Sequence, residues 1–472
     1  KAQRLVDWNT DVLARLLKQV VARRNVAHKQ RRGDSFTAPA YATPKLYLDN
    51  NGRTVLDEVK EIIHLPEFAS KSASNQENPE SIDLGEEAMA QLRDYVSIIA
   101  TMYRDNPFHN FEHASHVTMS VVKLLSRIVA PDKVADADDS GGMHNLASTL
   151  HDHTYGITSD PLTQFACVFA ALIHDVDHTG LPNTQLVKEK RALASTYNDR
   201  SVAEQNSVDI AWALLMDDRF SSIRRVVYSN DDELKRFRQL VVNSVMATDI
   251  MDKDLKELRN SRWDRAFQES AAAVPESIRD TVNRKATIVI EHLIQASDVS
   301  HTMQHWHIYR KWNELLFEEL YVAYKSGHSD KDPSDFWYKG EMGFFDFYII
   351  PLAKKLNDCG VFGVSSDEYL NYAQKNRQEW ERRGQDVVAS MIEKFSVLYA
   401  DCDNDLDFDA DDDDDLVDDQ DHGGVRLDDI QDEEKTELRS QLARTDTFSD
   451  EDILGDADIN DEAEAAVETV LV

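Results

Sequence analysis

Apolar residues recur three and four positions apart along most of this chain, which is the spacing of one face of an α-helix. The clearest repeats lie at residues 11–24, 202–216 and 336–356. Strict alternation of apolar and polar residues, the pattern of a half-buried strand, is almost missing between residues 86 and 398. We therefore predict an all-α protein whose main part is a compact multi-helix domain.

Two breaks and one change of composition divide the chain. Residues 30–47 carry two prolines, and residues 70–83 are rich in Ser, Asn and Glu. Beyond residue 400 the chain holds 29 acidic and 4 basic residues. We predict an N-terminal helix and linker over residues 1–84, a folded domain over 85–400, and a disordered acidic C-terminal tail over 401–472.

The helix predicted over residues 11–24 has a single apolar stripe. We expect this stripe to pack against the folded domain or against a second copy of the chain. It consists of Val12, Leu13, Leu16, Leu17, Val20 and Val21.

Charge and cysteine content narrow the functional class. The chain has 52 Lys and Arg against 87 Asp and Glu, a formal net charge of −35, which argues against a nucleic-acid partner. Its three cysteines are too few and too scattered for a disulfide framework, which suits a reducing compartment. The longest apolar run, residues 165–173, is too short to cross a bilayer. We expect a cytoplasmic protein with no transmembrane segment in this chain.

Histidines and aspartates gather where predicted helices begin or end. His109 and His113 are four residues apart, and we expect them on one face of a helix. The apolar run ends in His174-Asp175-Val176-Asp177-His178, and a second apolar helix ends at Asp298. Titratable groups at the end of a buried segment are unfavourable unless they are paired or metal-bound. We predict a site for divalent metal, because imidazole and carboxylate suit Zn²⁺, Mg²⁺ and Mn²⁺.

Simpler interpretations of these residues stay open at this point. A single histidine could be a hydrogen-bonded core residue, and Asp298 could cap a helix. A second His-Asp pair occurs at His151-Asp152-His153, but we expect no apolar helix to hold it in place, so it is the weaker candidate.

The pattern of His, His-Asp and a distant Asp at helix ends resembles the HD metal-phosphohydrolases. More specifically, His109-Asn110-x-x-His113-Ala114 and His174-Asp175-x-x-His178-x-Gly180-x-x-Asn183 resemble two signatures of the class I cyclic nucleotide phosphodiesterases. The resemblance extends from about residue 94 to residue 397. It implies hydrolysis of 3′,5′-cyclic nucleotides, cGMP or cAMP, to 5′-monophosphates, which ends a cyclic-nucleotide signal.

The resemblance also implies a role for individual residues. His109 would be the general acid that protonates the departing O3′. Asp175 would bridge a tightly bound ion, usually zinc, to a second ion, usually Mg²⁺ or Mn²⁺. The ligands of the tight site would be His113, His174, Asp175 and Asp298. The metal side of the pocket would include His178, Asn183, Glu204, Thr248 and Asp249. The nucleoside pocket would include Tyr309, Trp312, Leu316, Glu341 and Phe344, with Phe344 stacking on the purine.

The chain departs from the family pattern at Glu341, where the family has a glutamine that hydrogen-bonds the purine. An ionised Glu only accepts hydrogen bonds, whereas Gln accepts and donates. Guanine offers two donors on this edge, so we predict a preference for cGMP, although its O6 would be repelled. His116 replaces a usual Asp and Phe108 a usual Tyr. We therefore expect His109 to be oriented by different contacts from those in the family.

Two other functions remain as alternatives: a catalytically inactive cyclic-nucleotide sensor, and another HD-type nucleotide phosphohydrolase. A sensor should lack a metal ligand or the acid, and all five residues are present. A homodimer also stays open. Because the chain starts at Lys1 rather than at Met, we leave open an upstream cyclase or a membrane anchor that would tether it to the cytoplasmic face of a membrane.

Overall fold

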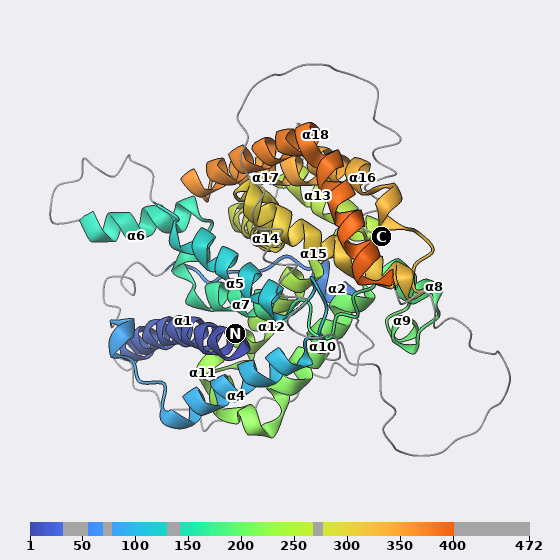
Figure 1. The fold of residues 1–472 in the computed structure, drawn as a ribbon. Helices are drawn as coiled ribbons and strands as arrows, with labels where there is room; N and C mark the ends of the chain where they lie inside the picture. Colours follow the sequence, from blue (N-terminus) through green and yellow to red (C-terminus); the bar gives the residue numbers. More distant parts are fainter. Residues whose placement is uncertain (32–54, 69–77, 130–141, 268–276, 401–472) are drawn as a thin grey trace, which may run out of the picture. The chain divides into compact units, whose positions relative to one another are not determined.

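A computed structural model describes residues 1–31, 55–68, 78–129, 142–267 and 277–400. In these ranges the regular structure is helical and contains no strand, which confirms the predicted all-α class (Figure 1). The predicted acidic tail, residues 401–472, lies outside the described residues, as does most of the predicted linker at 30–47. None of the described helices is long and apolar enough to cross a membrane.

Helices of three or more turns form most of the fold. They are α1 (Ala2–Arg31), α4 (Glu86–Met102), α5 (Phe111–Ser126), α6 (Gly142–His153), α7 (Pro161–Ile173), α10 (Val202–Met216), α12 (Asp231–Met246), α13 (Lys253–Phe267), α14 (Ile278–Asp298), α15 (Trp306–Lys325) and α18 (Val364–Leu398). Shorter helices connect them: α2 (Val55–Val59), α8 (Asn183–Lys188), α9 (Ala192–Thr196), α11 (Ser221–Val227), α16 (Trp337–Phe344) and α17 (Ile350–Asp358).

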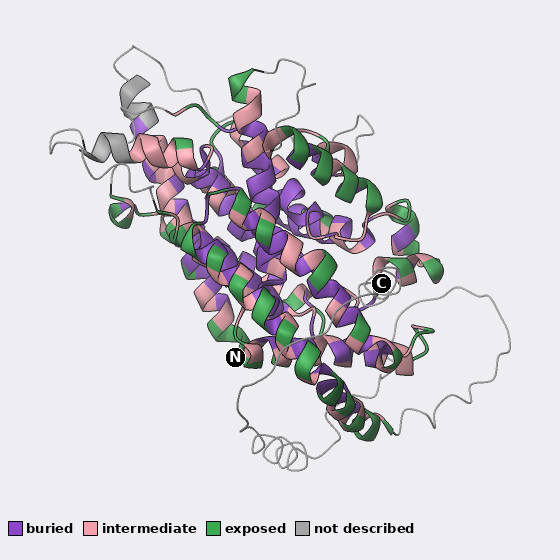
Figure 2. Ribbon diagram, turned by 90° about the horizontal axis from the view of Figure 1, so that it is seen from above, coloured by how far each residue is buried: buried purple, intermediate pink, exposed green. Residues whose placement is uncertain are grey.

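Helix α7 lies in the centre of the hydrophobic core. It is apolar on nearly every side, and such a helix is stable only when other helices surround it. Helices α12, α1 and α5 pack against it. In Figure 2 the buried positions follow the inward faces of the helices, and the exposed positions follow the outer faces. The packing of α7 holds its last residues, and therefore His174 just after them, in a defined place.

Helix α1 is longer than the predicted helix at 11–24. Its apolar stripe packs into the core as expected, although Leu16 and Val21 are only half-buried. Leu13 and Leu17 are 0% and 1% exposed. The helix packs against α7, α4 and α5, and the Asn9 amide donates a buried hydrogen bond to Ser115 Oγ of α5 at 3.0 Å. Helix α1 thus belongs to the same hydrophobic core as the helices of residues 85–400.

One local prediction is wrong. His109 does not share a helix with His113, because α5 begins only at Phe111. Asn110 is its N-cap, and the Asn110 side-chain oxygen accepts hydrogen bonds from the backbone N–H groups of Glu112 and His113. His151 lies on α6, whose described side chains are not part of the hydrophobic core, and its Nδ1 is 2.6 Å from Ser159 Oγ.

The predicted helical repeat at 336–356 is a single helical path with a wider turn inside it. Helix α16 continues into a π-helix at Phe345–Ile349 and then into α17. Pro351 lies in the first turn of α17. Proline has no N–H to donate to the preceding turn, so a change of hydrogen-bond pattern just before it is expected.

Candidate active site

Four side chains from three helix ends converge on one point. His113 comes from the first turn of α5, His174 and Asp175 follow α7, and Asp298 is the last residue of α14. His113 Nε2 lies 3.1 Å from Asp298 Oδ1 and 3.6 Å from Asp175 Oδ2. His174 Nε2 lies 3.0 Å from Asp175 Oδ2 and 3.3 Å from Asp298 Oδ1. The structure therefore brings together all four predicted ligands.

The contacts of His174 fit a bound cation. Its Nδ1 donates to the carbonyl of Ala171 at 2.9 Å, so Nε2 carries a lone pair whenever the ring is neutral. Without a cation, the carboxylates of Asp175 and Asp298 outweigh burial and raise the pKa of His174 well above its usual value. This buried Nε2 makes no well-directed hydrogen bond, although carboxylate oxygens lie on two sides. A lone pair buried against carboxylates is unfavourable unless a positive charge lies between them. Two imidazoles and two carboxylates are also a ligand set that divalent ions accept.

Contacts within this cluster lower the pKa values of its two carboxylates, Asp175 and Asp298. Burial disfavours the charged carboxylates, but the two imidazoles outweigh that effect and hold the pKa of Asp298 well below its usual range. Asp175 shows the same direction, since His174 lowers its pKa despite burial. Both carboxylates are thus in the ionised form that a metal ligand requires.

His109 lies next to this cluster and is held by a buried glutamate. His109 Nδ1 is 2.5 Å from Glu319 Oε1. The other oxygen of Glu319 accepts the backbone N–H groups of Phe108 and His109 at 2.8 and 2.9 Å. Burial would lower the pKa of His109, but the charge and hydrogen bond of Glu319 outweigh burial and raise it to about 9. His109 is consequently an imidazolium at neutral pH.

Glu319 is a site residue that the sequence analysis missed. It lies on α15 in the same stripe as Trp312 and Leu316, at spacings of four and three residues. A carboxylate that continues a stripe of predicted pocket residues was a usable signal.

His178 stacks on His109, with ring centroids 4.0 Å apart. His178 Nδ1 accepts the backbone N–H of Gly180 at 3.1 Å, so Nε2 carries the proton of the neutral ring. Burial and the positive charge of His109 lower the pKa of His178 to about 4. His109, His178 and Glu319 are close enough together to hold an ion. The Nδ1 atoms of both rings are already engaged, by Glu319 and by Gly180, and His109 is charged, so this trio fits a proton donor better than a cation site.

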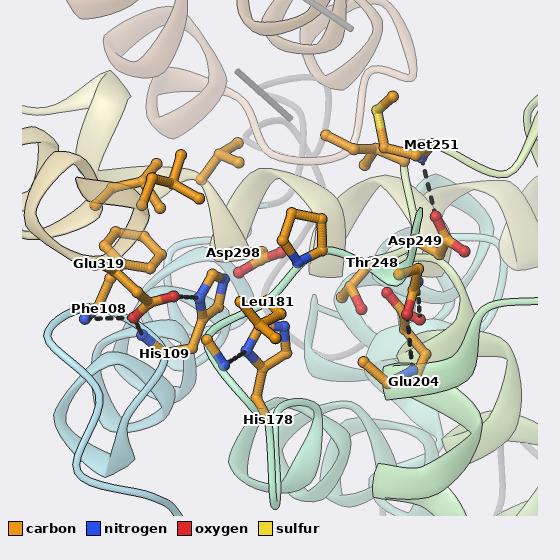
Figure 3. A pocket seen from close by; sticks show the side chains of 18 of the residues that line it. Phe108, His109, His178, Leu181, Glu204, Thr248, Asp249, Met251, Asp298 and Glu319 are labelled. Carbon is orange, nitrogen blue, oxygen red and sulfur yellow. Dashed lines mark hydrogen bonds and ion pairs between the residues drawn. The ribbon is translucent and has the colours of Figure 1, made fainter. Parts of the chain in front are cut away.

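A pocket opens beside these residues, with about 1100 Å³ of empty space including its mouth (Figure 3). The five residues predicted for its metal side, His178, Asn183, Glu204, Thr248 and Asp249, all line it. Asn183 donates to Glu204 at 2.9 Å. Burial, together with the charge of Asp249, raises the pKa of Glu204 to about 8.

The residues predicted for the nucleoside pocket divide into two layers. Leu316 and Phe344 line the pocket itself. Tyr309 and Glu341 are buried and do not line it, and the Tyr309 hydroxyl donates to Glu341 Oε2 at 2.5 Å. Burial raises the pKa of Glu341 to about 7.

Trp312 packs its ring edge-on against His116 rather than facing the pocket. His301, which the sequence analysis did not single out, also lines the pocket.

Several curated proteins have sequences similar to this chain. One similar protein is the "Probable 3′,5′-cyclic-AMP phosphodiesterase pde-4" of Caenorhabditis elegans, 26% identical over 61% of this chain and 39% of the relative. Another is the human "Dual specificity calcium/calmodulin-dependent 3′,5′-cyclic nucleotide phosphodiesterase 1C", 28% identical over 54% of this chain and 31% of the relative. The chain thus spans well under half the length of these curated relatives.

A solved structure is similar as well. The phosphodiesterase domain of the RhoPDE fusion protein from the choanoflagellate Salpingoeca rosetta is 21% identical, with a TM-score of 0.48, over 66% of this chain and 86% of that one. The sequence model of the 3′,5′-cyclic nucleotide phosphodiesterase family matches residues 108–360, which is more than half of the 472 residues. The chain therefore belongs to the 3′,5′-cyclic nucleotide phosphodiesterase family.

Proposed function

We propose that this chain hydrolyses 3′,5′-cyclic nucleotides to 5′-monophosphates with divalent metal bound. The observation that carries the proposal is the pairing of His109 with Glu319 beside four converging metal-ligand side chains. A proton donor and an electrophilic centre on one wall of a pocket are the two parts that phosphodiester cleavage needs.

His113, His174, Asp175 and Asp298 would hold the tightly bound ion, which we propose is zinc. Asp175 would bridge to a second ion, Mg²⁺ or Mn²⁺. Bound there, such ions neutralise phosphate charge and make water a nucleophile near neutral pH.

His109 supplies the proton for the leaving group. Its Nδ1–H is engaged by Glu319 at 2.5 Å, so the proton available for transfer is the one on Nε2. As the bond between phosphorus and O3′ breaks, O3′ takes this proton and leaves as a hydroxyl. Glu319 keeps its charge throughout and stabilises the imidazolium before transfer. Burial disfavours that charge, but His109 outweighs it and lowers the pKa of Glu319 to about 2.

For the base, we propose that a purine lies between Leu316 and Phe344 with one edge toward Glu341. Glu341 is one helical turn before Phe344 on α16, so both lie on one face of that helix. Glu341 is buried behind the pocket in this structure, so its side chain would have to turn toward the pocket to accept from guanine in its ionised form. On that basis we propose that cGMP has the higher kcat/KM. Glu341→Gln, which restores a donor, should shift the preference toward cAMP. A wild-type preference for cAMP would contradict this assignment.

The first experiment measures release of 5′-GMP and 5′-AMP from the two cyclic nucleotides with Mg²⁺, with Mn²⁺ and after chelation. We expect turnover that chelation removes and metal restores. Binding of a cyclic nucleotide without turnover, in protein shown to contain metal, would favour the sensor alternative instead. Turnover only of other nucleotide phosphoesters would favour another HD-type phosphohydrolase. The cytoplasmic location, a homodimer and an upstream cyclase or anchor stay predictions.

A further inference from the structure

Two loops carry the side chains at the proton-donor end of the pocket. One loop precedes α5 and carries His109; the other follows α7 and carries His178. Asn106 lies in the first loop, three residues before His109. Its side-chain Nδ2 donates to the carbonyl oxygen of His109 at 3.0 Å and to that of His178 at 2.8 Å. Both partners are acceptors only, which fixes the orientation of the amide.

The remaining contacts of Asn106 leave its side chain little freedom. Its backbone carbonyl accepts from the side chain of Asn110, the residue that caps α5. Gly180 approaches the other side, in a left-handed conformation with φ of 75°. A Cβ at Gly180 would lie 3.2 Å from Asn106 Oδ1, closer than an ordinary contact. Gly180 therefore leaves space for the Asn106 amide at the point where the two loops meet.

We infer that Asn106 is a positioning residue that sets the distance between the rings of His109 and His178. Glu319 anchors the His109 ring from α15, and Asn106 anchors the His109 backbone to the loop of His178. The two anchors together hold the rings in the 4.0 Å stack. Displacement of a reacting group by about 1 Å can cost roughly 100-fold in rate.

The kinetic test rests on the proposed function. For Asn106→Ala we expect kcat to fall about 10- to 100-fold, with KM and metal content unchanged. In a His109→Ala background the same change should have almost no effect, because no proton donor remains to be misplaced. An equal loss in both backgrounds, or full activity of Asn106→Ala, would overturn the inference. Asp105→Asn, an exposed neighbour, is the matched control and should be fully active.

A second measurement does not depend on turnover. With histidine rings labelled with ¹³C, NMR of Asn106→Ala should show changed ring proton shifts for both His109 and His178, whereas Asp105→Asn should leave them unchanged. If Asn106→Ala fails to fold, Asn106→Asp has nearly the same volume and turns an oxygen toward both carbonyls, so it should show the same shift changes. Unchanged shifts in the folded variant would overturn the inference. Lack of wild-type turnover would overturn the proposed function and leave this result valid.

Discussion

His109 and His113 belong to one short motif, yet their ring nitrogens face different groups. His109 Nδ1 faces the Glu319 carboxylate, which keeps the ring charged. His113 Nε2 faces Asp298 and Asp175 in the cluster that we assign to metal. The partner that each ring meets in the fold therefore separates a proton donor from a ligand, although both residues are histidines.

Substitution should separate these two roles. Asp298→Ala removes a proposed ligand, so we expect metal content and activity to fall together. His109→Ala should keep its metal and lose about 100-fold or more in turnover, the usual scale for loss of a general acid. Metal analysis alongside kcat checks both. Full metal content with normal turnover in Asp298→Ala would contradict the ligand assignment.

The pH dependence of kcat should report on Glu319. The acid works only when protonated, so activity should fall as pH rises through about 9, the pKa of His109. In Glu319→Gln the charge that raises this pKa is gone, and the alkaline limb should move down toward about 6.5 or lower, the value of an unperturbed or buried histidine. Glu318→Gln is the control, because Glu318 accepts from Tyr399 instead. If the alkaline limb of the Glu319→Gln profile stayed near pH 9, the contact with Glu319 would not be what raises the pKa of His109.

At the scale of elements, the ends of helices assemble the site. His174 follows the C-terminus of α7, and Asp298 ends α14. The C-terminal end of a helix carries partial negative charge from its unpaired carbonyls. Two such ends beside two carboxylates favour a bound cation. The four proposed ligands are therefore held at the ends of buried helices.

Helix α1 should contribute strongly to stability, although it lies far from the ligands in sequence. Leu13 is fully buried in the core that also holds α7. We expect Leu13→Ala to lower the free energy of unfolding by about 2–5 kcal/mol, the cost of a large cavity in a packed core. Arg15→Ala, at an exposed position of the same helix, should change it by less than about 0.5 kcal/mol. Chemical denaturation measures the free energy of unfolding of both variants. If Leu13→Ala lowered it as little as Arg15→Ala does, α1 would not be part of the folding core.

At the scale of the whole molecule, burial of the metal cluster should couple metal binding to folding. Asp175 and Asp298 are half-buried carboxylates that face the same two imidazoles, so a divalent cation bound among these four side chains would stabilise the folded state. A ligand that binds only the folded state adds stability that grows with its concentration.

Metal removal should therefore lower both activity and the Tm. At a metal concentration 100 times Kd the bound ion adds about 2.7 kcal/mol. The contribution of bound metal to stability can be measured by thermal unfolding before chelation, after chelation and after metal is restored. Asp298→Ala should have a lower Tm than the wild type with metal and should respond much less to chelation. A Tm that chelation leaves unchanged would show that no ion stabilises the fold.

Sequence alone determined the helical class, because helical apolar spacing repeats through the folded part of the chain. It also singled out His174, Asp175 and Asp298, since titratable residues at the end of an apolar helix are unfavourable without a partner, and it singled out His109 and His113 by their spacing of four residues. The helix α10 was predicted with its observed ends, Val202 and Met216. These features are local, and each depends on residues that are near one another along the chain.

Only the tertiary structure decided which distant side chains meet. Glu319 is 210 residues from His109, and Asn106 is 72 residues from His178, so no spacing in the sequence reveals either contact. The start of α5 was misplaced because the Asn110 cap competes with a regular helical pattern that His109 would have continued. The charge state of His109 was also decided by the tertiary structure. Burial and a partner set its pKa, and the partner is present because α15 places Glu319 against the loop that precedes α5.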